Sequence, residues 1–154
     1  MNATPMLSIK PYLIKAYYEW IIDSGCTPYV LIQANLPHVQ VPAQYIDPED
    51  ETIVFNIDPQ AVQNLDWQKN KLIFQASINT IIHYISIPYY AIIEIFAEEN
   101  EEGARFAIDP KEVEKISVLL SDSSDKKEKK PGSKTQLPPY LRILRPDSSE
   151  DSNS

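Results

Sequence analysis

The sequence predicts a mainly β protein with some helix (α+β), in which a small, strongly curved antiparallel sheet or open barrel carries an N-terminal helix. Three observations lead to this fold class. One early segment has apolar residues at helical spacing, several short segments are rich in β-branched and aromatic residues, and the C-terminal part is polar. We therefore expect one folded domain over residues 1–116, followed by a disordered C-terminal tail.

The predicted helix covers Pro11–Ser24. Pro11 suits the first helical position, and Gly25 suits the residue that follows the last turn. Its apolar residues form two stripes. The first stripe consists of Leu13, Ala16, Tyr17, Trp20 and Ile21, and the second of Ile14, Tyr18 and Ile22. Two stripes favour a second partner, such as the same helix of another copy; the alternative is a helix buried deep within its own domain.

Short strands are predicted along most of the domain. The clearest pair spans Lys71–Pro88, where apolar residues alternate on both sides of a two-residue hairpin loop at Asn79-Thr80. The remaining predicted strands are Tyr29–Asn35, Val39–Val41, Ile53–Ile57 and Ala104–Ala107. They are short and separated by turn residues, which is typical of a curved antiparallel sheet.

Further helical segments are predicted at three places. Asp58–Leu65 and Asp109–Ile116 each begin with Asp-Pro, a pattern that caps a helical turn. Tyr89–Ala97 follows Pro88 and is predicted as a second helix that packs through Ile92, Ile93 and Phe96.

The chain after Ile116 is predicted to lie outside the folded domain. We expect residues 117–136 to form a flexible linker and residues 147–154 a disordered end. The polar segments Ser121–Gln136 and Asp147–Ser154 bury too little apolar surface to offset the entropy of ordering. Between them lies an apolar and basic island, Leu137–Pro146. We expect this island to bind another protein; the alternative is that it folds back as an edge strand.

Charge and cysteine content limit the partners and the compartment. Met1–Ile116 carries seven Lys and Arg residues against 16 Asp and Glu, a net charge of −9, and the rest of the chain has a net charge of +1. Nucleic acid is therefore a poor partner for the domain. The single cysteine, Cys26, fits a reducing compartment. With no visible signal peptide or membrane-spanning apolar run, we expect a cytoplasmic protein.

Candidate catalytic groups are few. His38 and His83 have no evident acid or nucleophile beside them, and the acidic residues of Glu98–Glu102 lack the spacing of a calcium loop. Three glycines in the whole chain cannot supply a loop that cradles phosphate. The sequence therefore predicts a binding protein, not an enzyme, with no metal and no cofactor.

An extended peptide is the ligand that a small antiparallel sheet with free edges suits best. Within Phe74–Ile78, Gln75 and Ser77 could make polar contacts, and Ala76 leaves room for close approach. The alternative is that Phe74, Ala76 and Ile78 belong to the core.

Several segments together carry a resemblance to a known family. They are Pro11–Trp20, Thr27-Pro28, Leu36–Pro42, Tyr45, Ile53–Leu65, Phe74–Ala76 and Ile87-Pro88. In register over most of Pro11–Phe106, with one small insertion near Asp47–Glu51, they resemble the stringent starvation protein B family. The segment Pro139–Arg145 resembles the motif in that family's tail.

The resemblance implies a homodimeric adaptor of the ClpXP protease. Such an adaptor binds the ssrA degradation tag, which is added to proteins on stalled ribosomes, and carries the tagged polypeptide to the ClpX unfoldase. The implied fold is a pair of stacked antiparallel sheets, Sm-like in outline. The implied tag-binding residues are Tyr45, Asn56, Phe74, Gln75, Ala76, Ser77 and Ile78. The implied dimer contacts are Tyr12, Leu13, Ala16, Tyr17 and Trp20. The implied ClpX-docking residues are Tyr140, Leu141, Arg142, Ile143, Leu144 and Arg145.

The sequence departs from the family pattern at two places. Asn79-Thr80 stands where the family has a glycine pair, and Thr tolerates positive φ poorly. Eight residues follow Pro146, although the family motif tends to be terminal. Two rival functions stay open: an Sm-like RNA-binding or transcription-associated module, which the acidic domain disfavours, and an enzyme, which lacks an evident nucleophile–base pair.

Overall fold

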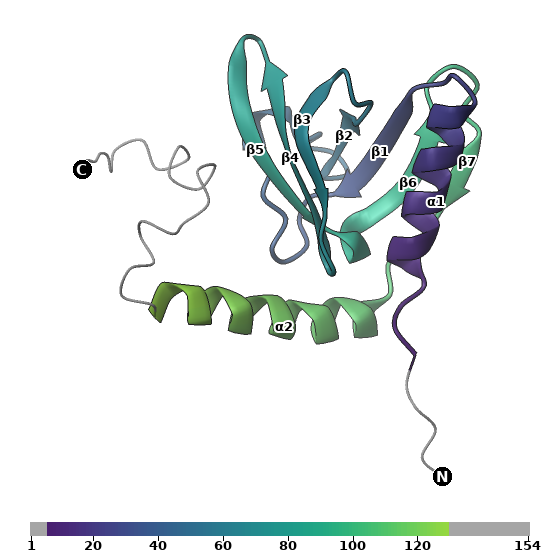
Figure 1. Cartoon of the computed structure of the whole chain (residues 1–154). Helices are drawn as coiled ribbons and strands as arrows, with labels where there is room; N and C mark the ends of the chain where they lie inside the picture. Colours follow the sequence, from purple (N-terminus) through teal and green to yellow (C-terminus); the bar gives the residue numbers. More distant parts are fainter. Residues whose placement is uncertain (1–5, 130–154) are drawn as a thin grey trace.

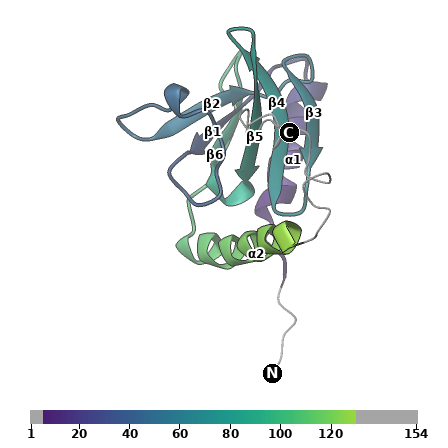
Figure 2. The same cartoon turned by 90° about the vertical axis from the view of Figure 1, so that its left-hand side faces the viewer.

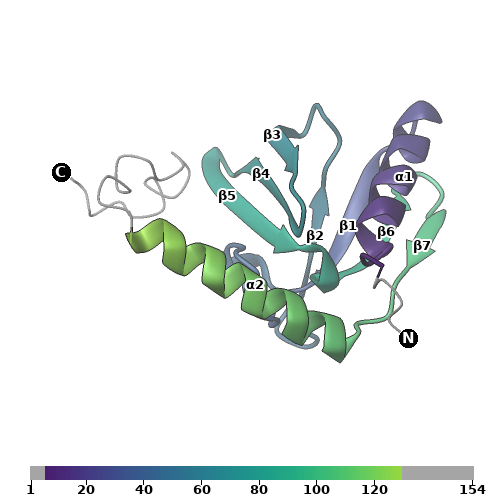
Figure 3. The ribbon, with the colours of Figure 1, turned by 60° about the horizontal axis from the view of Figure 1, so that its bottom comes forward.

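Two antiparallel sheets and two helices make up the part of the chain that the structure describes. The structure is a computed structural model that describes residues 6–129, and the side chains of residues 6–122. The two sheets face one another, α1 lies beside the four-stranded sheet, and α2 crosses one end of the body (Figure 1). Figure 2 and Figure 3 show the same arrangement from two other sides. The predicted fold class, mainly β with an N-terminal helix and two antiparallel sheets, is confirmed.

The helix α1 spans Lys10–Asp23 and begins and ends one residue earlier than predicted. Pro11 lies in its first turn, and Gly25 follows it with a φ of 79°, a left-handed conformation that glycine adopts without strain. Ile14 and Ile21 are 0% and 2% exposed, and α1 packs mainly on β6. On the other side, Tyr12 and Trp20 are exposed, so the alternative of a helix buried deep within its own domain is wrong.

The four-stranded sheet has the strand order β2-β1-β6-β7. Its strands are β1 (Pro28–Gln33), β2 (Thr52–Asn56), β6 (Ile92–Ala97) and β7 (Gly103–Arg105). Val30 of β1 lies opposite Phe55 on one side and Ile95 on the other. A side chain at Gly103 would place its Cβ 1.9 Å from the Ile95 carbonyl oxygen, so only glycine permits β7 to approach this closely.

The three-stranded sheet has the order β3-β4-β5. Its strands are β3 (Val62–Trp67), β4 (Lys71–Ile78) and β5 (Ile81–Pro88). The predicted hairpin is confirmed, because Ile78 pairs with Ile81 around the two-residue loop. Asn79 and Thr80 have φ values of 52° and 66°, as a tight type I′ turn requires. Thr80 therefore takes the left-handed conformation that its branched side chain disfavours.

The predicted helix at Tyr89–Ala97 is wrong. Only Tyr89–Ala91 is helical, as the short 3-10 helix η2, and Ile92 begins strand β6. β6 pairs with β1 on one side and with β7 on the other. Its isoleucines favour this pairing because β-branched side chains pack well on a sheet.

The predicted helical segment at Asp58–Leu65 is also wrong beyond its first turn. The Asp58 carboxylate accepts the backbone N–H of Gln60 at 2.9 Å, and the Asp58 carbonyl accepts that of Ala61 at 2.8 Å. The capped turn therefore forms. Val62 then pairs with Ala76, so the chain continues as strand β3.

The capped turn at Asp109 leads into a longer helix than predicted. α2 spans Pro110–Lys129, so the expectation of a flexible, non-globular chain from Ser117 onward is wrong for residues 117–129. Leu120 is only 8% exposed and joins the core, with Val113 and Ile116 packed beside it at helical spacing. These apolar contacts stabilise α2 on the body, although most of its residues are polar.

Two short predicted strands are smaller than expected. Val39–Val41 is reduced to a single bridge between Gln40 and Ser86, and the strand predicted at Ala104–Ala107 is β7, which is shifted by one residue and shorter. Between β1 and β2 the chain forms the 3-10 helix η1 (Ala43–Tyr45).

The core lies between the two sheets and under α1. Phe55 of β2 and Phe74 of β4 meet edge to face there, with ring centroids 5.5 Å apart. Tyr90 is 1% exposed and donates its hydroxyl to the Pro37 carbonyl oxygen at 2.6 Å. This shared core fixes the positions of β2 and β4 relative to each other.

Candidate functional site

A groove of about 590 Å³ lies between β2 and β4. Its walls come from η1 and the chain after it, from all of β2, from the turn before β3 and from the end of β4. The lining residues are Tyr45, Asp47, Thr52, Ile53, Val54, Phe55, Asn56, Ala61, Ala76, Ser77 and Ile78. The groove is therefore a product of the way the two sheets stack, not of any single segment.

Both strands beside the groove have unpaired stretches of backbone. β2 is the edge strand of its sheet, and within the described residues only β1 pairs with it. β4 pairs with β3 as far as Ala76, so Ser77 and Ile78 extend beyond that partner. Edge backbone of this kind can hydrogen-bond an extended chain laid alongside it.

Five of the seven residues expected to bind a peptide line the groove: Tyr45, Asn56, Ala76, Ser77 and Ile78. Ala76 is 7% exposed and forms part of the floor, where any larger side chain would reduce the space. Ser77 is exposed, and Ile78 is half-buried. This end of β4 thus contributes both apolar and polar surface.

Phe74 and Gln75 do not line the groove. Phe74 is 1% exposed and packs against Phe55, so its ring lies in the core, as the alternative interpretation had it. Its role at the site is to support Phe55, which does line the groove.

Tyr45 connects η1 to the β4–β5 hairpin. Its hydroxyl accepts a hydrogen bond from the Asn79 side-chain amide at 3.1 Å, and its ring meets His83 edge to face at 5.9 Å. The Asn79-Thr80 loop thereby supports one wall of the groove. His83 Nε2 is buried and has no hydrogen-bond partner among the described residues.

The groove is mostly uncharged. Asp47 is the one residue with a formal charge among those that line it. Val54, one of the lining residues, is 46% exposed. An uncharged, partly apolar wall beside free backbone suits the main chain and small side chains of a peptide.

The outer face of α1 carries the predicted dimer contacts. Tyr12, Leu13 and Trp20 are 62%, 36% and 46% exposed, Ala16 is exposed, and Tyr17 is half-buried. Ile21, which the sequence pattern placed in the same stripe, belongs to the buried side. The predicted ClpX-docking residues Tyr140–Arg145 lie outside the described residues.

The histidines and acidic residues form no metal-binding cluster among residues 6–129. His38 Nε2 lies 3.1 Å from the Ser121 hydroxyl and so joins the loop after β1 to α2. The Glu99 carboxylate accepts the backbone N–H and the hydroxyl of Thr27 at 2.8 and 2.6 Å, which lowers its pKa. In the same part of the chain, neither helix is long and apolar enough to cross a membrane.

Comparison with known proteins places the chain in a family. The family model for stringent starvation protein B matches residues 8–152. The chain belongs to the stringent starvation protein B family. One member, the stringent starvation protein B homolog of Haemophilus influenzae, is 35% identical over 104 residues, which cover 68% of this chain and 67% of the relative. The match to the stringent starvation protein B model extends over the whole body and past the Leu137–Pro146 island.

The sequence pattern missed six groove residues: Asp47, Thr52, Ile53, Val54, Phe55 and Ala61. They belong to the walls formed by β2 and its flanking turns, and their place depends on how that strand faces β4. Tyr45 and Asn56 were expected only from the resemblance to the stringent starvation protein B family. No local signal in the sequence marks them as neighbours of Ala76.

Proposed function

We propose that this protein is a specificity-enhancing adaptor of the ClpXP protease. The groove binds the ssrA tag of a tagged polypeptide, and the island Leu137–Pro146 tethers the complex to ClpX. The observation that carries the proposal is the groove itself, which brings together residues of η1, β2 and β4 beside free strand edges. Membership of the stringent starvation protein B family supports the same function.

An extended tag fits the groove for two reasons. The free edge of β2 offers backbone hydrogen bonds that any peptide sequence can make, which supply affinity. Ala76, Ser77 and Asn56 then select side chains by size and polarity. A sequence-specific but reversible contact is what a delivery adaptor requires.

The outer stripe of α1 supports a homodimer. Leu13, Ala16 and Trp20 recur at helical spacing and are exposed, and Ile9, one turn before Leu13, is 65% exposed. A two-fold contact between two such helices would cover these side chains, because a symmetric interface pairs a surface with itself. Each dimer would then carry two grooves and two C-terminal segments.

The helix α2 shapes the tether. A 20-residue helix is about 30 Å long, and Leu120 fixes its first half to the body. The seven residues from Lys130 to Gln136 can add at most about 25 Å before the island begins. A tether of this reach converts delivery into an intramolecular step and raises the effective concentration toward the millimolar range.

The proposal is tested by the affinity for a fluorescently labelled ssrA peptide, measured by anisotropy. Ala76→Trp adds an indole to the floor of the groove, so affinity should fall by at least about tenfold, a loss of about 1.4 kcal/mol. Val118→Trp adds the same side chain on an exposed part of α2 outside the groove and serves as the control. Equal affinities for the two variants would contradict the placement of the tag.

A further inference from the structure

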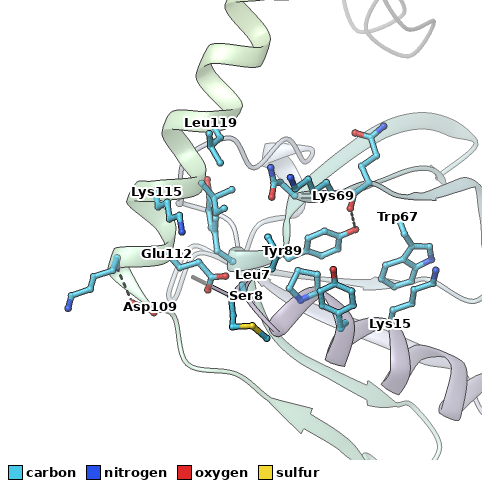
Figure 4. A pocket seen from close by; sticks show the side chains of 18 residues that line it. Leu7, Ser8, Lys15, Trp67, Lys69, Tyr89, Asp109, Glu112, Lys115 and Leu119 are labelled. Carbon is cyan, nitrogen blue, oxygen red and sulfur yellow. Dashed lines mark hydrogen bonds between the residues drawn. The ribbon is translucent and has the colours of Figure 1, made fainter. Parts of the chain in front are cut away.

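A second cavity, of about 630 Å³, lies where the two helices meet the β3–β4 turn (Figure 4). We call it the helix pocket. Part of its wall is apolar: Met6, Leu7 and Leu119 are 88%, 64% and 46% exposed. Trp67 and Tyr89 form another wall with parallel rings, 6.3 Å between centroids. Exposed apolar groups gathered around a cavity of this size mark a binding surface.

The helix pocket is positively charged in a negatively charged body. Four lysines line it, Lys15, Lys69, Lys111 and Lys115, against two carboxylates, Asp109 and Glu112, a local net charge of +2. The domain over residues 1–116 has a net charge of −9. An occupant should therefore combine apolar side chains with negative charge.

The C-terminal segment of the same chain has this chemistry. Leu141, Ile143 and Leu144 are followed within a few residues by Asp147, Glu150 and Asp151. Arg142 and Arg145 lie among the apolar residues, so residues 137–154 have a net charge of −1, and the negative charge is concentrated after Pro146. We propose that residues 137–154 bind in the helix pocket of their own chain, with the apolar side chains against the Met6–Leu7–Leu119 wall and the carboxylates on the lysines.

The end of α2 places this segment within reach. Leu119 lies ten residues before the last helical residue, Lys129, or about 15 Å back along the helix axis. The eight residues from Lys130 to Leu137 can span up to about 27 Å, so the island can return to the pocket without any change in α2.

Weak contacts suffice for this docking because the segment is tethered. Exposed lysine–carboxylate pairs contribute only about 0.2–1 kcal/mol each, and buried apolar area adds to them. At an effective concentration in the millimolar range, a contact with a Kd near 1 mM is already about half occupied. The eight residues after Pro146 thereby acquire a role: their carboxylates favour the bound state.

The effect of this docking on delivery to ClpX rests on the proposed function. While the island occupies the helix pocket, the same apolar side chains are unavailable to ClpX. The segment would therefore alternate between its own pocket and the unfoldase, and the acidic end would set the balance.

Amide NMR spectra of the full-length protein test the docking without any tag or unfoldase, so failure of this inference leaves the proposed function untouched. Leu141→Ser/Ile143→Ser/Leu144→Ser should shift the amides of Lys69, Asn70 and Leu119. The groove residues Tyr45 and Ser77 should keep their shifts. Asp147→Asn/Glu150→Gln/Asp151→Asn should cause smaller shifts at the same pocket residues, and added salt should reproduce them.

Three outcomes would overturn the inference. Pocket amides that stay in place in both variants would show that the segment does not bind there. Shifts seen only when residues 1–5 are deleted would assign the pocket to the N-terminal end. Shifts that appear only as protein concentration rises would assign it to a second copy. A Ser149→Ala variant, which keeps the charges and the apolar residues, is the matched control and should leave the pocket amides unchanged.

Discussion

The groove and the helix pocket have nearly the same volume, about 590 and 630 Å³, but opposite characters. The groove lies between two sheets, is almost uncharged and has free strand backbone beside it. The helix pocket lies between the two helices and the β3–β4 turn and is rich in lysine. Volume alone would rank them as equals, so the chemistry of the walls has to decide which ligand each can take.

If both proposals hold, this difference in chemistry allows one small body to bind two polypeptide segments at once. Free backbone can hydrogen-bond any extended chain, and the side chains of the groove wall then select among such chains, which fits the proposed tag. A charged pocket with apolar walls instead selects one composition, which suits a single segment that is always nearby. Variants that lack the C-terminal segment, or that lack the side chain supporting the groove, should affect the two sites separately.

Deletion of residues 137–154 should have the largest effect. The truncated protein should bind a labelled ssrA peptide as the full-length chain does, because the groove lies wholly within residues 45–78. ClpXP degradation of a tagged substrate at limiting concentration should fall by about 10²-fold or more, toward the rate without adaptor, since tethering is lost.

Removal of residues 147–154 alone is the control for this deletion. It keeps the island, so the acceleration should be retained, or increased where loss of the acidic end frees the island from the helix pocket. Degradation that remains accelerated without residues 137–154 would refute the tethering role of the segment.

The second prediction separates the groove from the core below it. Phe74→Ala should lower the free energy of unfolding by about 3–5 kcal/mol, because the ring is 1% exposed and packs on Phe55. Ser77→Ala should change it by less than about 0.5 kcal/mol, since Ser77 is exposed. Urea denaturation of the two variants measures both values.

Tag affinity should respond differently from stability in these variants. Ser77→Ala should weaken peptide binding while the protein stays folded, because it removes a hydroxyl from the groove wall. A Phe74→Ala variant as stable as the unmodified protein would show that Phe74 lies outside the core. Phe74 would then again be a candidate for direct contact with the tag.

Some of this organisation follows from local sequence. Pro11 and Gly25 mark the ends of α1, and alternation around Asn79-Thr80 identifies the β4–β5 hairpin, because both signals depend on a few neighbouring residues. Tyr89–Ala97 was misassigned because a short apolar run fits a helix and a buried strand equally well. Its pairing with β1, in which Ile32 lies opposite Ile92, decides the outcome.

The groove and α2 could be predicted only in part for a similar reason. The polar residues from Ser121 onward predict no packing, yet Val113, Ile116 and Leu120 anchor α2 through contacts with distant elements. Ala76 and Ser77 were singled out from β4 itself, whereas Val54 and Phe55 join the site only because the sheets stack. Information about stacking is distributed over the whole core and is not contained in any short window.

The last prediction concerns the pH dependence of stability beside the helix pocket. Burial raises the pKa of Tyr90, which lines the pocket, to about 12, above its usual value near 10. The folded state thus keeps the Tyr90 phenol neutral. The contribution of this group to stability is complete below pH 10 and is lost as pH rises from 10 toward 12.

Tyr90→Phe removes this titration, together with the hydrogen bond to the Pro37 carbonyl. The urea concentration at the unfolding midpoint should therefore decline less steeply between pH 8 and pH 11.5 in the variant than in the unmodified protein. Part of the decline should remain, because burial also raises the pKa of Tyr89. Tyr12→Phe, which removes an exposed hydroxyl from the same pocket, is the control; identical slopes for Tyr90→Phe and the unmodified protein would show that Tyr90 does not couple folding to pH.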